Sequence, residues 1–263
     1  MTTVADILKY VETLAPTYMK MDWDNVGLLC GSRETPVTKV LMALDPFEGV
    51  CREAAEWGAE LIVTHHPIIF DPLKSVTEET TVGRSIMTLC RHGISAVNAH
   101  TNLDCAPGGV NDVLADTLGL KDVETIPPFF RDDQGRQWGL LRRGRVEEQP
   151  LSQFLEIVKS SLNAEGLRYV DGGKPVRVVA VGGGHCSDEL MSAFEAGCDT
   201  FVTADIKYNE FWDAQALGMN LIDAGHFATE NPIVAVLAEK IAAAFPEVQV
   251  KISETHRDCM KFC

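Results

Sequence analysis

The sequence has no long hydrophobic run and little positive charge. None of its apolar stretches reaches the roughly 18–20 residues that a membrane-spanning helix needs. Its first residues lack the basic start and apolar stretch of a signal peptide, so we expect a cytoplasmic protein. With 23 Lys and Arg against 38 Asp and Glu, the net charge of -15 disfavours nucleic acid and membrane surfaces as partners. The one basic cluster, Arg142-Arg143-Gly144-Arg145, is expected to decorate a turn between strands.

Several catalytic and binding motifs are also missing. The 8 cysteines include no Cys-x-x-Cys pair, which indicates reduced core or surface residues rather than a zinc or disulfide framework. No Gly-x-Ser-x-Gly elbow is present, so a covalent serine nucleophile is not supported. The glycines Gly182–Gly184 have the spacing of neither phosphate-binding glycine motif, and Asp188 and Glu189 follow them. We therefore interpret these glycines as a tight turn between a strand and a helix.

The same order of predicted strands and helices occurs twice along the 263 residues. In the first copy, Asp45 is expected to cap a helix that stops at Gly58, with Pro46 and Glu48 completing the cap signal. In the second copy, Ser187 takes the capping position and the helix stops at Gly197. The expected elements, in chain order, are strand 40–44, helix 46–57, strand 61–64, helix 82–91 and strand 93–98, then strand 176–181, helix 188–195, strand 200–203, helix 209–217 and strand 218–223.

Strands that alternate with crossover helices favour parallel pairing, so we predict an α/β fold of two similar lobes produced by internal duplication. The first lobe is expected over residues 1–125, completed by 226–263, and the second over 126–225. The second lobe also carries a predicted β-ribbon at 138–146 and a helix at 151–162. The first copy holds 13 extra residues around 70–80, which either cover a site or form a plain connection.

Histidines and carboxylates gather where the predicted strands end. His100 precedes Asp104 by four residues, and His226 precedes Glu230 by four residues, with the two pairs 126 residues apart. Strand C-termini are where α/β folds place ligands. The matching position of the two pairs in the two copies therefore predicts a metal site rather than ordinary loop polarity.

His65 and His66 add two adjacent imidazoles at the end of another predicted strand. Adjacent side chains on a straight strand point to opposite faces, so both reach one site only if the chain turns there. Pro67 favours such a turn because it ends the strand. Together with the two pairs this gives more ligands than one ion needs. His100 is left with three possible roles: a ligand, a partner that orients Asp104, or an acid/base group, of which we favour the last two.

The chain resembles the Nif-three-like dinuclear-metal family, whose members are often labelled GTP cyclohydrolase 1 type 2 homologues. Its length is similar to that of the short form, which lacks an inserted central domain. The similarity runs from near residue 23 to residue 232. The segments that carry it are Trp23-Asp-Asn-Val-Gly27, Val63-Thr-His-His-Pro-Ile-Ile-Phe70, His100-Thr-Asn-Leu-Asp104, Gly108-Gly-Val-Asn-Asp112 and Asp223-Ala-Gly-His-Phe-Ala-Thr-Glu230.

This resemblance implies two similar α/β lobes and a toroidal homohexamer whose metal sites face an inner cavity. It places His66 and Asp104 on one divalent ion, His65 and His226 on the other, and Glu230 between the two. Iron, zinc and manganese all suit such ligands. The segment 203–209 departs from the family pattern at Ala204 and Asn209, while Lys207 and Tyr208 match it.

Two functions are consistent with these ligands. The first is a metal-dependent hydrolase of a nucleotide or phosphoester, resembling GTP cyclohydrolase, in which two ions bridge a hydroxide and His100 carries a proton. The alternative is a non-catalytic protein, either a metal store or insertion chaperone or a regulator that binds a partner. A third interpretation, in which the histidines are only structural, explains least well why the candidate ligands occupy matching strand ends in the two copies.

Overall fold

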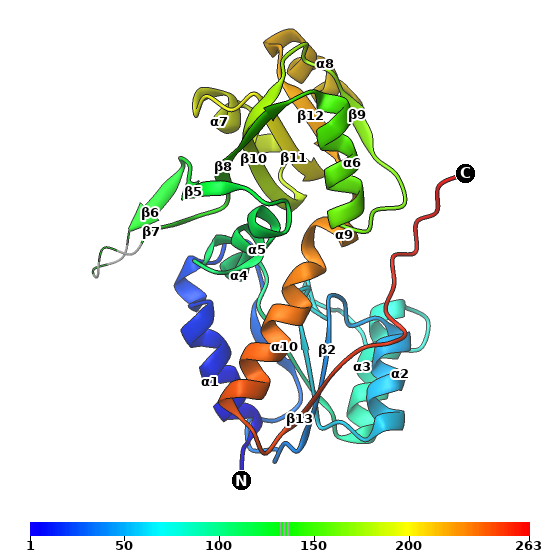
Figure 1. The fold of residues 1–263 in the computed structure, drawn as a ribbon. Coiled ribbons are helices and arrows are strands. Elements are labelled where there is room, and N and C mark those ends of the chain that lie inside the picture. Colours follow the sequence, from blue (N-terminus) through cyan, green and yellow to red (C-terminus); the bar gives the residue numbers. More distant parts are fainter. Residues whose placement is uncertain (132, 134, 136) are drawn as a thin grey trace. The chain divides into compact units, whose positions relative to one another are not determined.

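The computed structural model describes residues 1–131, 133, 135 and 137–263, which divide into two compact units (Figure 1). The first unit consists of residues 1–103 and 234–257, and the second of residues 104–233 and 258–263. The first division falls earlier than the expected boundary at residue 125. The reason is that β5 (Lys121–Thr125) pairs with a strand of the second unit's sheet.

The first unit is built on a five-stranded sheet in the order β1-β4-β3-β2-β13. The pairs joining β4, β3, β2 and β13 are parallel, and β1 runs antiparallel to β4. In Figure 1, α2 and α3 lie on one side of this sheet, and α1 and α10 lie on the other. The strands are β1 (Gly27–Cys30), β2 (Lys39–Ala43), β3 (Leu61–Thr64), β4 (Ser95–Asn98) and β13 (Gln249–Ile252), and the helices are α1 (Val4–Leu14), η1 (Thr17–Met19), α2 (Glu48–Trp57), α3 (Thr81–His92) and α10 (Pro232–Ala244).

The second unit is built on a six-stranded sheet in the order β5-β8-β10-β11-β12-β9, with a separate hairpin β6-β7. Its central strands β10, β11 and β12 are parallel, as are β2, β3 and β4 of the first unit, and this shared arrangement shows the duplication. The strands after β5 are β6 (Phe129–Arg131), β7 (Gln137–Gly139), β8 (Arg142–Gln149), β9 (Arg168–Val170), β10 (Val176–His185), β11 (Thr200–Ala204) and β12 (Asn220–Asp223). The helices are α4 (Thr101–Cys105), α5 (Val110–Thr117), α6 (Leu151–Ser161), η2 (Ser187–Glu189), α7 (Leu190–Glu195), α8 (Tyr208–Leu217) and α9 (His226–Glu230). Both α4 and α10 cross the boundary between the units.

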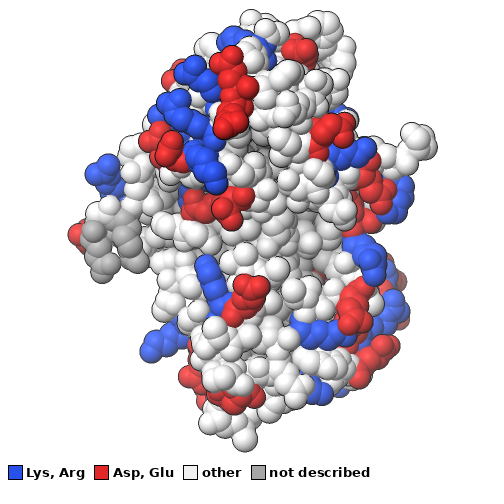
Figure 2. All heavy atoms as spheres, viewed as in Figure 1, with Lys and Arg blue, Asp and Glu red and all other residues white. Residues whose placement is uncertain are grey.

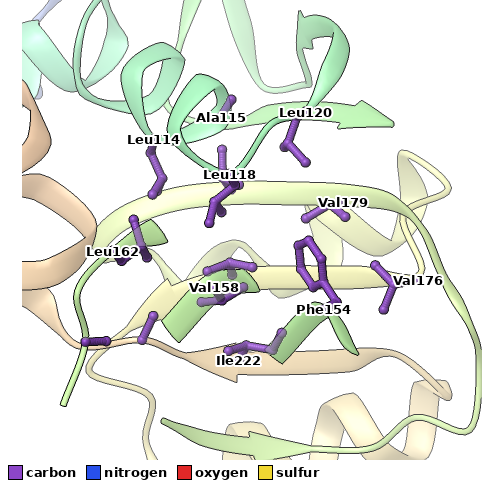
Figure 3. Packing of buried hydrophobic residues seen from close by; sticks show 14 of the residues in the cluster. Leu114, Ala115, Leu118, Leu120, Phe154, Val158, Leu162, Val176, Val179 and Ile222 are labelled. Carbon is purple, nitrogen blue, oxygen red and sulfur yellow. The ribbon is translucent and has the colours of Figure 1, made fainter. Parts of the chain in front are cut away.

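Alternation along the central strands supplies two apolar faces in the second unit. Val179 and Val181 pack on one side with Phe154 of α6, while Ala180 packs on the other with residues of α7 and α8. Figure 3 shows the first of these layers, with side chains from α5 and α6 meeting the sheet around Val158. Because both faces are covered, the strands are buried, as the α/β prediction requires.

Four predicted local features are wrong. The N-cap of α2 is Phe47 rather than Asp45, whose carboxylate binds two imidazoles instead. The glycines Gly182–Gly184 form no turn but continue strand β10, and Ser187 begins a 3-10 turn without capping a helix through its side chain. Arg142 does not decorate a turn: it lies within β8 and is only 2% exposed.

Charge of both signs is distributed over the surface shown in Figure 2, where acidic side chains lie among basic ones and no extended basic patch is visible. Within the described ranges, every helix is too short or too polar to cross a bilayer. On this face the carboxylates are therefore dispersed rather than gathered into one acidic patch.

The chain after β13 is fastened to the first unit by Glu53, a buried carboxylate on α2. Burial raises the pKa of Glu53, but hydrogen bonds from Ser253, the Glu254 N–H and Thr255 outweigh this effect and lower the pKa to about 2. A lowered folded-state pKa stabilises the fold at pH values above the ordinary pKa of 4.5. That contribution is lost as the pH falls from 4.5 towards 2.

We therefore expect Glu53→Gln to lower the free energy of unfolding by about 2–3 kcal/mol at pH 7. The difference from the wild type should shrink as the pH is lowered from 5 to about 2, because the wild-type carboxylate is then protonated. Urea denaturation at several pH values measures both effects. The exposed Glu56 on the same helix is the matched control, and Glu56→Gln should change little at any pH. A Glu53→Gln penalty that does not depend on pH would contradict the expectation.

Candidate metal centre

Three histidines of the first unit form one cluster. His65 and His66 follow β3, and His100 follows the neighbouring strand β4. Their rings lie close, with centroids separated by 4.8 Å for His65 and His66 and by 5.2 and 5.4 Å for His100 with each of these. One nitrogen from each ring lies within 4.8 Å of the others, close enough to share an ion. The two adjacent imidazoles thus reach one place, as the turn predicted before Pro67 requires.

Each of these rings is held through its Nδ1 atom. His65 Nδ1 donates to the backbone carbonyl of Ala99 at 2.9 Å, and His66 Nδ1 lies 2.7 Å from Asp45 Oδ1. His100 Nδ1 lies 2.8 Å from Asp24 Oδ1. A hydrogen bond of this kind fixes the ring and its tautomer, and it leaves Nε2 as the atom that meets a metal ion.

The two carboxylates that hold these rings are ionised. Burial raises the pKa of Asp24, but the hydrogen bonds from His100 and Thr101 outweigh it and lower the pKa to about 2. Burial likewise opposes ionisation of Asp45, and the hydrogen bonds from His256 and His66 lower its pKa well below the ordinary range. Negative charge behind an imidazole increases the ring's strength as a ligand.

In the second unit, His226 and Glu230 lie one turn apart on α9, with His226 Nε2 at 3.1 Å from Glu230 Oε2. His226 Nδ1 lies 2.6 Å from Asp205 Oδ2, so this ring too is held by a carboxylate. Burial lowers the pKa of His226, but the hydrogen bonds with Asp205 and Glu230 outweigh it and raise the pKa to about 11. A proton on His226 Nε2 thus joins this ring to Glu230, and a bound cation would take the place of that proton. Asp205 has a positive φ of 53°, an uncommon backbone for a residue other than glycine.

The glycines at the end of β10 make room for Glu230. A Cβ atom on Gly184 would lie 2.1 Å from Glu230 Oε1, and its φ of +61° also favours glycine. Gly183 approaches the same side chain, since its Cβ would lie 3.1 Å from Glu230 Cγ. The glycines of this run are therefore required by the space that the buried Glu230 side chain occupies.

Asp104 is buried on α4, and its helix is held in place by neighbouring polar groups. Asn111 donates to the carbonyl of Asp104 at 3.2 Å, and Arg142 donates to the carbonyl of Cys105 at 3.2 Å. Burial raises the pKa of the Cys186 thiol, and the negative charges of Asp104 and Glu230 add to this effect. Both carboxylates therefore create a negative potential in the same region of the second unit, which favours a cation.

The sequence interpretation missed the residues that hold the histidines. Asp24 lies in the segment Trp23-Asp-Asn-Val-Gly27, but its role was not assigned. In the sequence, Asp45 fits a helix-cap pattern, Asp205 lies within the family segment 203–209, and His256 lies far from the other candidate residues. Asp45 lies two residues after β2, and Asp205 directly follows β11. Their position at strand ends was the signal that could have identified them as residues of the site. The donors in each unit, imidazole nitrogens and carboxylate oxygens, fit a hard or borderline divalent cation.

A model of the Duf34/NIF3 (NGG1p interacting factor 3) family matches residues 2–259. The chain belongs to the Duf34/NIF3 family. This confirms the resemblance found from the motifs. Among its relatives in the Duf34/NIF3 family is the GTP cyclohydrolase 1 type 2 homolog of Clostridium perfringens, which is 35% identical over 98% of each chain. That of Halalkalibacterium halodurans is 46% identical over 97% of this chain and 98% of the relative.

Solved structures show the same fold. A Bacillus cereus protein related to NIF3 superimposes with a TM-score of 0.91, at 27% identity and with 100% of this chain and 99% of that chain covered. Reduced HcgD from Methanocaldococcus jannaschii superimposes with a TM-score of 0.80 at 25% identity, over 96% and 98% of the two chains. The predicted α/β class with its Nif-three-like fold is therefore confirmed for this member of the Duf34/NIF3 family.

Proposed function

We propose that the chain is a dinuclear metal-dependent hydrolase that acts on a nucleotide or another phosphoester. Its ligands are His65, His66, Asp104, His226 and Glu230. The grouping of these five on two ions comes from the family resemblance, in which Glu230 serves both. Iron, zinc or manganese would fit the donors, which include no thiolate.

The observation that carries the proposal is the common orientation of four imidazoles. His65, His66, His100 and His226 all engage an acceptor through Nδ1 and present Nε2. Three of the four acceptors are carboxylates, and the fourth is a backbone carbonyl. Metal-binding histidines almost always show this pattern. The carboxylate behind three of the rings distinguishes them from the exposed His92, whose Nδ1 lies 2.9 Å from a carbonyl of its own helix.

When bound, two divalent ions would supply Lewis-acid polarisation and activation of water near neutral pH. The chain's own contribution is to hold the ligands and to move a proton. His100 is suited to the second task, because its contact with Asp24 fixes Nδ1 and leaves Nε2 as the nitrogen that can exchange a proton. With five other ligands available, His100 is free to act as the acid/base group rather than as a ligand.

Two exposed aromatic side chains beside His100 support a substrate that carries a flat ring. Trp23 is 64% exposed and Phe70 is 51% exposed, and their ring centroids lie 5.7 Å apart. Each also lies near His100, with centroids at 6.2 Å for Trp23 and 6.1 Å for Phe70. Large exposed aromatics offer stacking surfaces to heteroaromatic rings. A nucleobase meets this description, which agrees with the nucleotide-like substrate proposed above.

Replacing His100 by alanine tests the proposal. We expect the variant to keep the metal content of the wild type and to lose about 10²–10⁴-fold in kcat on a nucleotide or phosphoester turned over by the metal-loaded wild type. Elemental analysis and a hydrolysis screen measure the two quantities. His92→Ala, on the exposed end of α3, is the control. Metal that loads and leaves readily with no turnover by the wild type would favour the metal-store alternative.

The resemblance also supports a homohexamer in the cytoplasm. Light scattering coupled to size-exclusion chromatography would detect about six chains per particle for such an assembly. A monomer at working concentration would remove the hexamer from the proposal without affecting the metal ligands.

A further inference from the structure

One carboxylate of the first unit lies between two imidazoles. Asp45 Oδ1 is 2.7 Å from His66 Nδ1, and Asp45 Oδ2 is 2.8 Å from His256 Nε2. The two rings thus engage different oxygens of one side chain. The backbone N–H of Asp45 also lies 3.2 Å from His256 Nε2, but one nitrogen cannot both donate and accept. The contact with the charged Asp45 Oδ2 is the shorter of the two, so we assign the proton to His256 Nε2, which donates to this oxygen.

His256 is brought to Asp45 by a segment with several fixed contacts. Strand β13 pairs with β2 in parallel, with Ile252 opposite Met42, and so carries the following residues towards the end of β2. Glu53 then accepts hydrogen bonds from Ser253 and Thr255, and Ser253 Oγ accepts from the His256 N–H at 3.2 Å. Only 8% of the His256 side chain is exposed.

The Phe47 ring, at 6.0 Å between centroids and 75° between planes, lies edge-on to the His256 ring. The imidazole is thereby bounded on one side by an aromatic group and on another by the Asp45 carboxylate. A histidine that served only to fill space would not need a buried glutamate to fix its backbone and a carboxylate to fix its ring. The arrangement restricts the rotation of Asp45, and Asp45 in turn restricts the rotation of His66.

We propose that His256 is a positioning residue of the metal centre, which fixes the Asp45 carboxylate and through it the His66 ring. This inference rests on the proposed function, since it requires His66 to bind metal. His256 itself touches no ion. Its effect is to remove a rotational freedom that Asp45 would otherwise have, so that His66 presents Nε2 in one orientation. Loss of such an outer partner weakens metal binding by about 10–100-fold.

The test is titration of the metal-free full-length chain with Zn²⁺ in competition with a chromophoric chelator. We expect His256→Ala to weaken one of two binding steps by at least about 10-fold and to leave the other unchanged. His256→Gln should remain within about threefold of the wild type, because the amide can still donate to Asp45. Asp45→Asn should weaken the same step as His256→Ala. The control His92→Ala, in the same unit, should bind as the wild type does.

A double-mutant cycle separates positioning from general structural damage. If His256 acts through His66, adding His256→Ala to His66→Ala changes zinc affinity no further. Additive losses would overturn the proposal, as would normal binding by His256→Ala or an equal loss in His256→Gln. If His256→Ala does not fold, the comparison of His256→Gln with Asp45→Asn decides the matter. A wild-type chain that binds no zinc would overturn the metal function itself, and this outcome is distinguishable from a failure of His256 alone.

Discussion

Replacing Arg142 by methionine is expected to lower the free energy of unfolding by about 3–5 kcal/mol. The Arg142 guanidinium is only 2% exposed, and it binds the Asp112 carboxylate with Nε at 2.6 Å from Oδ1. It also donates to the carbonyls of Gly139, Cys105 and Ala106. A methionine of similar length fills the space but leaves these acceptors without their donor, and buried unpaired groups are costly. Urea denaturation followed by circular dichroism measures the loss.

Arg145 on the same strand provides the matched control. Its side chain is exposed, so Arg145→Met should change the free energy of unfolding by no more than about 0.5 kcal/mol. Arg142 also holds the end of α4, which carries Asp104, so the Arg142→Met variant should bind metal more weakly where it still folds. Equal stability of the two variants would show that the buried hydrogen bonds of Arg142 contribute no net free energy.

Arg142 also illustrates what the sequence could not reveal. Four consecutive residues with three arginines indicate a solvated turn on composition alone, because charged residues are rarely buried. The buried position depends on Asp112 and on carbonyls contributed by α4 and by the last residue of β7. Such acceptors are contributed by the tertiary fold, and no local sequence pattern predicts them. The repeated elements of the two copies were predictable, since apolar strands such as 61–64 and the helix that ends at Gly58 are set by local periodicity and backbone freedom.

The residues of the candidate site were likewise predictable only in part. The histidines at the strand ends were recognisable because their type and position follow from chain order. The acidic residues behind them were not, because Asp45 also fits a local capping pattern that competes with the long-range contact. His256 lies 190 residues beyond His66, and only the pairing of β13 with β2 brings its segment to the same end of the sheet.

Neutralising Glu230 is expected to remove both metal ions, whereas removing one histidine is expected to remove one. Two dications about 4 Å apart repel each other by on the order of 15 kcal/mol at an effective dielectric constant near 20. Imidazoles are neutral ligands and cannot offset this repulsion, so the carboxylate that we propose to serve both ions is decisive. The change Glu230→Gln keeps the packing of this buried side chain against Gly184 while removing its charge. Elemental mass spectrometry of protein purified without chelator should give near zero for Glu230→Gln and about two ions for the wild type.

The metal content of Glu230→Gln is interpreted by comparison with that of the histidine variants. His65→Ala and His66→Ala should each keep about one ion, because each removes a ligand from a single ion and leaves the shared charge in place. The control His92→Ala should keep both ions. Retention of one ion by Glu230→Gln would show that Glu230 serves a single metal, and retention of both would remove it from the ligands. Loss of both ions in every variant, histidine or glutamate, would instead indicate that the two ions bind only as a cooperative pair, because each then depends on the other to hold the bridging carboxylate.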